Sequence, residues 1–260
     1  ASAGTSNFRA GVNAGNSIAS GGNYNTVVGD EAGTAITTGD DNTFIGYNAG
    51  TAVTTGQFNT LIGADSGDAI TTSGYNTAIG WESLSANTSG EVQTALGVST
   101  LRANTTGTQN TAVGGNAMYS NTEGDNNVAV GHNALDANTT ADNNTAVGKN
   151  ALGANTTADN NTAMGYNAGA AVTTGTRNTL IGGAAGDAIT TADDNVAIGQ
   201  TALGTDTLGS KSVAVGRAAL ATQNFTTATD SYNTAVGFQA GEAVTTGLNN
   251  TLIGALAGDA

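Results

Sequence analysis

One short phrase, repeated at a fixed interval, constrains the fold of this chain more than any other feature. Its clearest copy is Asn144-Thr145-Ala146-Val147-Gly148. Fifteen copies start at residues 7, 25, 42, 59, 76, 93, 110, 127, 144, 161, 178, 195, 212, 233 and 250, and every step from 25 to 212 is 17 residues. Self-similarity at a short fixed period is typical of a solenoid, in which each unit stacks on its neighbours. The 260 residues therefore predict a single repeat domain over 1–260.

We number each repeat from its first residue, which is usually Asn. Position 2 is Thr or Val and position 4 is aliphatic or Met in every copy after the first. Because alternate residues of a strand share a face, positions 1 to 5 predict a short strand whose positions 2 and 4 point into the core. Gly at position 5 of every copy indicates a bend where a side chain would clash. The predicted fold is an all-β, parallel β-solenoid of about fifteen 17-residue coils, with the Asn side chains stacked as an amide ladder.

The second half of the repeat alternates between two patterns. Some copies have Leu at position 9 and Asn at position 12, as in Leu135 and Asn138, whereas others have Gly and an aliphatic residue, as in Gly186 and Ile189. Since each coil keeps one large side chain, positions 9 and 12 are predicted to fill the same pocket. The repeat that starts at Ser212 is four residues longer than its neighbours and predicts a loop insertion over 222–230.

Composition excludes several classes of function. Twenty acidic and six basic residues give a net charge of −14, which argues against nucleic acid or an anionic membrane as a partner. The chain has no cysteine, hence no disulfide or thiolate chemistry, and no apolar run long enough to span a membrane. Small residues at the start, Ala1-Ser2-Ala3, suit the position after a cleavage site. With the acidic composition they predict an extracellular protein, secreted or on a cell or virion surface.

The Asn-Thr-Ala-Val/Ile-Gly copies and Ser212-Val213-Ala214-Val215-Gly216 resemble the head repeats of trimeric autotransporter adhesins. They also resemble repeats of some phage tail fibres. The resemblance covers nearly the whole chain and implies a left-handed parallel β-roll that assembles laterally as a trimer. The repeat here is longer than the usual adhesin-head repeat, so the resemblance implies a fibre but no particular receptor.

Residues with catalytic or metal-binding chemistry are few. His132 is the only histidine, at position 6, where other copies carry unrelated residues, so we expect an exposed side chain and no enzyme activity. Asp125, Asp142 and Asp159 all fall at position 16 and would stack about 4.8 Å apart. A Ca²⁺ ion between turns would relieve their repulsion. Exposure to water and screening by salt is the alternative.

Three surface features predict binding. Position 3 alternates with positions 2 and 4, so it is predicted to face outward as a lateral apolar stripe covered by another subunit. The larger members of this stripe are Val27, Phe44, Leu61, Leu180 and Leu252. Thr at positions 13 and 14 would form an outward ladder, which leaves ice binding open. Aromatic residues at positions 6 and 17 would stack on sugars, such as a surface glycan, or pack against a neighbouring chain. These residues are Tyr47, Trp81, Tyr166, Phe238, Phe58, Tyr75 and Tyr232.

The phase of the repeat at the two ends predicts head-to-tail assembly. The last copy stops at position 11, and the six residues before the first copy would supply positions 12 to 17. We therefore expect the first six residues of one subunit to complete the last coil of another. The residues concerned are Ala1, Ser2, Ala3, Gly4, Thr5 and Ser6 at one end, and Leu256, Gly258, Asp259 and Ala260 at the other. A fragment of a longer array would match in the same way. The predicted function is a structural subunit of a self-assembling fibre, with a receptor-binding adhesin or tail fibre and an ice-binding solenoid as alternatives.

Overall fold

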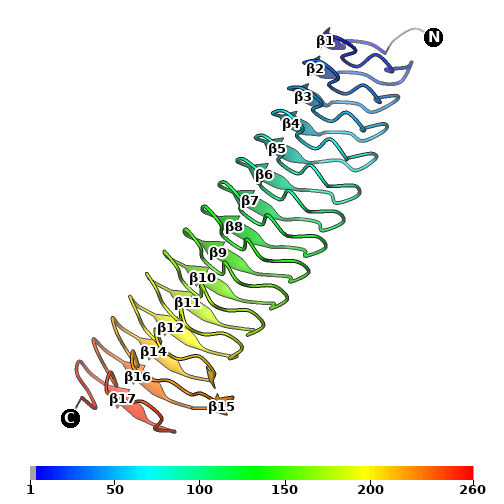
Figure 1. Ribbon diagram of the computed structural model, residues 1–260. Coiled ribbons are helices and arrows are strands. Elements are labelled where there is room, and N and C mark those ends of the chain that lie inside the picture. The colour runs from blue at the N-terminus through cyan, green and yellow to red at the C-terminus, as the bar shows by residue number, and fades with distance from the viewer. Residues whose placement is uncertain (1–3, 260) are drawn as a thin grey trace. The chain divides into compact units, whose positions relative to one another are not determined.

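A computed structural model describes residues 4–259, which form short strands and turns and contain no helix. The chain divides into two compact units, Ala1–Asn127 and Val128–Ala260. Each unit is a stack of coils, and each regular coil contributes one short strand to a parallel sheet (Figure 1). The predicted all-β, parallel β-solenoid with a 17-residue coil is confirmed. Its left-handedness and the single domain over 1–260 stay predictions.

In the first unit the described strands pair in chain order, each parallel to the next and in the same register. For example, Thr43 lies opposite Thr60, and Thr60 lies opposite Thr77. The strands are β1 (Phe8–Ala10), β2 (Thr26–Val28), β3 (Thr43–Ile45), β4 (Thr60–Ile62), β5 (Thr77–Ile79), β6 (Thr94–Leu96) and β7 (Thr111–Val113).

The second unit repeats this arrangement and adds a small second sheet. Its main strands are β8 (Val128–Val130), β9 (Thr145–Val147), β10 (Thr162–Met164), β11 (Thr179–Ile181), β12 (Val196–Ile198), β14 (Val213–Val215), β16 (Thr234–Val236) and β17 (Thr251–Ile253). The small sheet pairs β13 (Gly209–Ser210) with β15 (Thr229–Asp230). It lies where the predicted insertion leaves the regular coil.

The strands point the opposite way from the prediction. Position 3 faces the core: Val27, Phe44, Leu61 and Leu180 are fully buried, and Leu252 is partly buried. Positions 2 and 4 lie on the outer side of the sheet, half-buried or exposed. The lateral apolar stripe predicted at position 3 is therefore wrong. Alternation alone could not decide the direction, because β-branched and apolar residues occupy both faces of this strand.

The buried residues at positions 3, 9 and 12 share one volume. A methyl group added at Gly67 would lie 2.8 Å from Leu61 Cδ2 and 3.0 Å from Ile70 Cδ1. A methyl group at Gly186 would meet Leu180 and Ile189 in the same way. In keeping with this, every repeat with Leu or Met at position 9 has Ala at position 3. The predicted exchange between positions 9 and 12 is confirmed, and position 3 joins it because interiors conserve volume.

The predicted amide ladder runs along the coils at position 1. Asn42 Nδ2 donates to Asn25 Oδ1 at 3.1 Å and to the carbonyl of Gly56 in its own coil at 2.9 Å. The backbone N–H of Asn42 donates to the same Asn25 oxygen at 3.0 Å. These amides are fully buried. Each one therefore satisfies backbone groups that would otherwise be unpaired in the core.

Gly at position 5 allows two coils to approach. Gly46 has φ of +140°, and a Cβ there would lie 2.5 Å from the carbonyl oxygen of Gly63 in the next coil. Both the backbone conformation and the space exclude a side chain. The predicted bend is confirmed.

The insertion over 222–230 is anchored to the rest of the coil through Gln223, Phe225 and the short strand β15. Phe225 is buried against Gly209, and its backbone N–H donates to Asp206 Oδ1 at 3.1 Å. Asp206 is fully buried and also accepts from Gln223 Nε2 at 2.6 Å and from Gly209 N at 3.0 Å. The segment 226–228 is exposed. It is the part of the insertion that forms the predicted loop.

Candidate functional site

The outer face of each main sheet consists of two ranks of side chains, one at position 2 and one at position 4. The position 2 rank is Thr, with Val at 128, 196 and 213, and the position 4 rank is aliphatic or Met. Ile79 is 39% exposed and Met164 is 43% exposed. We call these two ranks the outer face. Successive members of a rank are about 4.8 Å apart, because they lie on paired strands.

In the Thr ladder predicted at positions 13 and 14, the position 13 hydroxyls form hydrogen bonds within the structure. Thr88 Oγ1 donates to the carbonyl of Thr105 at 3.0 Å, and Thr105 Oγ1 donates to the carbonyl of Thr122 at 3.0 Å. These position 13 hydroxyls join one coil to the next, whereas position 14 is exposed in the regular coils except at Leu208, which is half-buried. Regular paired ranks lie instead on the outer face.

The aspartates at position 16 bind backbone N–H groups of the preceding coil. Asp125 Oδ1 accepts from Thr108 N at 2.6 Å, and Asp159 Oδ1 accepts from Asp142 N at 2.8 Å. Within residues 4–259 no group of three or more His, Cys, Asp or Glu side chains could hold a metal ion. Asp125, Asp142 and Asp159 therefore do not form such a group among the described residues, and calcium binding between the coils stays a prediction. Backbone N–H groups of the preceding coils donate to the carboxylates of Asp125 and Asp159.

The single histidine lies where an exposed residue was expected. His132 is exposed, and its charge partly offsets the raised pKa of Asp136, which is caused mainly by burial. Position 10 also holds Asp68 and Asp187, and burial raises the pKa of both carboxyls. The prediction did not single out these position 10 acids. Their recurrence at one position of the repeat was the signal that would have found them.

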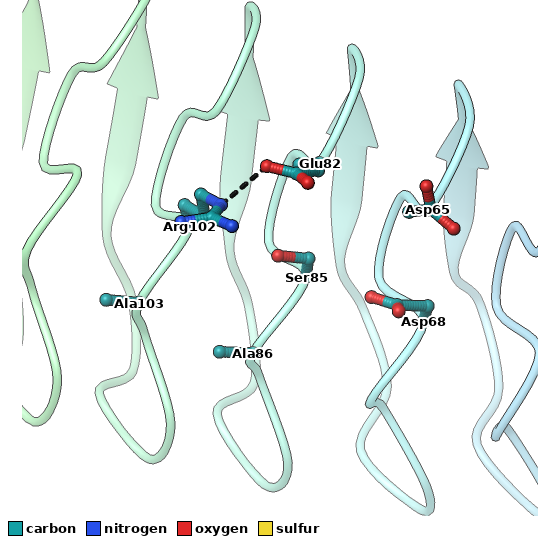
Figure 2. A pocket seen from close by; sticks show the side chains of 7 residues that line it. All are labelled: Asp65, Asp68, Glu82, Ser85, Ala86, Arg102 and Ala103. Carbon is teal, nitrogen blue, oxygen red and sulfur yellow. Dashed lines mark hydrogen bonds and ion pairs between the residues drawn. The ribbon is translucent and has the colours of Figure 1, made fainter.

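A pocket of about 440 Å³ lies on the flank of the first unit, beside positions 7, 10 and 11. Its lining residues are Asp65, Asp68, Glu82, Ser85, Ala86, Arg102 and Ala103. Figure 2 shows that their side chains come from three successive coils and lie on one side of the ribbon. Glu82 accepts a hydrogen bond from Arg102 Nε at 2.6 Å, and Arg102 also donates to Tyr119 Oη at 2.7 Å.

Asp68 is the least satisfied group in this pocket. Its Oδ1 atom is buried and has no hydrogen-bond partner among the described residues. Burial raises the pKa of Asp68, and the neighbouring Asp65 and Glu82 carboxylates raise it further. Asp65 accepts from Asn48 Nδ2 at 3.0 Å. The pocket thus holds three carboxylates and one guanidinium, and it can accept hydrogen bonds from a polar or cationic ligand.

The aromatic side chains at positions 6 and 17 form separate groups on the surface. Phe58 and Tyr75, at position 17 of successive coils, stack with ring centroids 5.0 Å apart. Tyr232 and Phe238 lie under Lys211 and Arg217 as cation–π pairs. Tyr47 and Trp81, at position 6, are exposed, and Trp81 directly precedes Glu82 of the pocket in the sequence. Sugar binding by these side chains stays a prediction.

The residues predicted for end-to-end assembly are described only in part, because Ala1, Ser2, Ala3 and Ala260 lie outside the described residues. Gly4 N donates to the carbonyl of Ala19, and Thr5 N donates to Asn23 Oδ1 at 2.9 Å. The described part of the N-terminal segment thus bonds to the first coil of its own chain. At the other end, Leu256 is exposed. Completion of a neighbouring subunit's last coil by Ala1–Ser6 stays a prediction.

Comparisons of the chain with protein-family models, with curated proteins and with solved structures gave no match. Across residues 4–259 no helix is long and apolar enough to cross a membrane. The site must therefore be interpreted from its own residues.

Proposed function

We propose that this chain is a structural, non-enzymatic subunit of an extracellular fibre that associates side by side with copies of itself. The outer face is the association surface. The observation that carries the proposal is the rank of aliphatic or Met side chains at position 4, which are half-buried or exposed on a chain whose net charge is −14. An extended apolar surface on an otherwise acidic protein is normally covered by a partner.

The free energy of association gained by covering the outer face is small for each coil and large for a stack of coils. Burying a fully exposed Ile or Val side chain contributes about 1.5–3 kcal/mol. Side chains such as Ile79 are already more than half covered, so each contributes roughly 1 kcal/mol. A rank of several coils would thus bind a second copy with useful affinity, even after the cost of association. Head-to-tail stacking through the termini would extend such a fibre lengthwise, and we propose it as a separate step.

Sedimentation velocity and electron microscopy of the intact chain test lateral association. The variant Ile45→Lys/Ile79→Lys places two charges on the outer face and is expected to abolish it. The control Thr55→Lys/Ser89→Lys adds the same charge at exposed position 14 of the same two coils and is expected to leave association unchanged. A monomeric wild-type chain, or equal association of both variants, would contradict the proposal. Removing residues 1–6 tests the lengthwise step, because fibre length falls only if these residues join subunits.

Ice binding is a second candidate, favoured by one observation. The outer face presents Thr and aliphatic side chains in two parallel ranks with constant spacing, which suits a periodic solid surface better than an irregular protein. Thermal hysteresis of the purified chain tests it. Activity that the Ile45→Lys/Ile79→Lys variant removes would favour ice over a second copy as the occupant. No hysteresis in the wild-type chain would exclude this function.

A further inference from the structure

We propose that Tyr47 and Trp81 form a slot over Ala64 that binds one ring of an amino sugar, with the neighbouring acidic pocket accepting its amine and hydroxyl groups. This proposal is independent of the fibre. It concerns the flank of the first unit, not the outer face.

The slot follows from the register of three strands. Tyr47, Ala64 and Trp81 occupy position 6 of successive coils, which follow β3, β4 and β5. Two strand spacings place Tyr47 and Trp81 about 9.6 Å apart along the stack. Ala64, whose side chain is a single methyl group, occupies position 6 of the coil between them. Tyr47 is 56% exposed and Trp81 is 52% exposed, so both rings are open to a ligand.

The spacing suits a pyranose ring. Phe58 and Tyr75, on adjacent coils, stack directly on each other with 5.0 Å between centroids. Aromatic rings two coils apart, at about 9.6 Å along the stack, are too distant to stack on each other. A sugar ring can fit between them. A pyranose has an apolar C–H face on each side and hydroxyl groups around its edge. Trp and Tyr present large apolar surfaces that suit such faces.

The polar groups of the pocket lie next to the slot in the sequence. Asp65 follows Ala64 and Glu82 follows Trp81, and both line the pocket of about 440 Å³ shown in Figure 2. Asp68 Oδ1 is buried there without a partner among the described residues. Three carboxylates against the one guanidinium of Arg102 leave two net negative charges. A sugar that carries an ammonium group is therefore favoured over a neutral one, and an acidic sugar is disfavoured.

A second pocket, in the other unit, shows what distinguishes the slot. It has a volume of about 340 Å³ and is lined by Asn133, Asp136, Asn150, Gly153, Ala154, Asn167 and Ala170. The position 6 residues of its first two coils are His132 and Lys149 rather than aromatic residues. The pocket alone therefore recurs along the chain, whereas the aromatic pair with a small residue between its members is found at Tyr47 and Trp81.

Fluorescence gives a direct test, because Trp81 is the only tryptophan of the chain. Trp81 emission is followed while the intact protein is titrated with a glucosamine tetrasaccharide, with cellotetraose and with a galacturonic acid tetrasaccharide. The expected result is saturable binding that is tightest for the glucosamine oligomer, weaker for cellotetraose and absent for the acidic oligomer. No change with any probe at millimolar concentration, or equal affinity for all three, would overturn the proposal.

Variants that retain Trp81 locate the binding site. Tyr47→Ala removes one wall and should weaken binding about tenfold, which corresponds to ~1.4 kcal/mol. Asp65→Asn should reduce the preference for the amino sugar, and Ala64→Phe should fill the slot and abolish binding. The matched controls are Tyr166→Ala, a position 6 tyrosine in the other unit, and Glu91→Gln, which removes an exposed charge at position 16. Equal affinity of the slot variants and the controls would show that the sugar binds elsewhere. Far-UV circular dichroism confirms that each variant keeps the fold.

Discussion

One coil should still fold when its three core residues are replaced together by those of the next coil. Each replacement made alone should destabilise the coil. The coil of residues 59–75 has Leu61, Gly67 and Ile70 at positions 3, 9 and 12, whereas the next coil has Ala78, Leu84 and Asn87. We expect the triple variant Leu61→Ala/Gly67→Leu/Ile70→Asn to fold like its neighbour.

The single variants should be strongly destabilised, for reasons visible in the contacts. A Cβ at position 67 would lie within 3.0 Å of both Leu61 and Ile70, so Gly67→Leu overpacks the core by ~1–3 kcal/mol. The left-handed backbone at Gly67, with φ of +56°, adds ~1–2 kcal/mol for a side chain. Leu61→Ala alone leaves a cavity and costs ~2–5 kcal/mol.

In the triple variant the cost of overpacking and the cost of the cavity offset each other. The cost of placing a side chain on the left-handed backbone remains. Leu84 already occupies the left-handed conformation natively, with φ of +58°. An Asn at position 70 would place its Oδ1 beside Asn87 Nδ2, as Asn87 Oδ1 lies 2.9 Å from Asn104 Nδ2 in the native ladder. It would also lie near the hydroxyl of Ser73, which is buried without a partner among the described residues. We therefore expect a net cost of only ~1–2 kcal/mol, set by the left-handed backbone.

Urea unfolding followed by Trp81 emission measures the effect, because Trp81 lies in the adjacent coil. Hydrogen exchange of peptides from 59–75 shows whether the changed coil itself stays folded. The three singles and the triple form a coupling cycle. If the triple variant is destabilised by the sum of the three single effects, then positions 3, 9 and 12 do not share one volume, and the argument is refuted.

Further outcomes are expected for changes at Asn76, at Asp68 and in the insertion. Asn76→Ala should lower the free energy of unfolding by ~1–3 kcal/mol, because the backbone N–H of Gln93 loses its acceptor. Asn76→Gln should lower it less, and thermal melting measures the stability of both variants. Asp68→Asn should raise the melting temperature at neutral pH and flatten its pH dependence. The raised pKa makes the folded state hold the proton to higher pH than the unfolded chain, so native stability falls as pH rises above the usual Asp range toward the folded pKa. Phe225→Ala should loosen β13 and β15 in hydrogen exchange by ~3 kcal/mol. Deleting 226–229 removes Thr229 of β15 but should leave the main sheet intact, because loop length contributes little to stability.

The fold was predictable because the residues that it requires recur at the same positions of the repeat. Gly at position 5 and Asn at position 1 recur in almost every copy, and the close approach at Gly46 and the amide ladder at Asn42 explain both. The exchange between positions 9 and 12 was predictable for the same reason. Fifteen copies turn a weak preference into a pattern that only stacking satisfies.

The direction of the strand was not predictable from alternation. Thr and Val exchange freely at position 2, which resembles a core position, yet Thr also suits an exposed strand. The signal that would have decided the matter was the inverse relation between the sizes of positions 3 and 9, as in Phe44 with Gly50 and Ala78 with Leu84. Two residues that trade volume must face the same space, so position 3 had to point inward.

The aspartates show why spacing alone does not define a metal site. Asp125 and Asp159 recur at the interval that would stack their charges, but a backbone N–H of the preceding coil lies against each carboxylate. In a solenoid every polar position is repeated, so a column of like side chains arises whenever one of them satisfies the backbone. Repetition therefore indicates structure first. Binding is better sought where the repeat departs from itself, as at position 6, where Tyr47, Ala64 and Trp81 follow one another in otherwise regular coils.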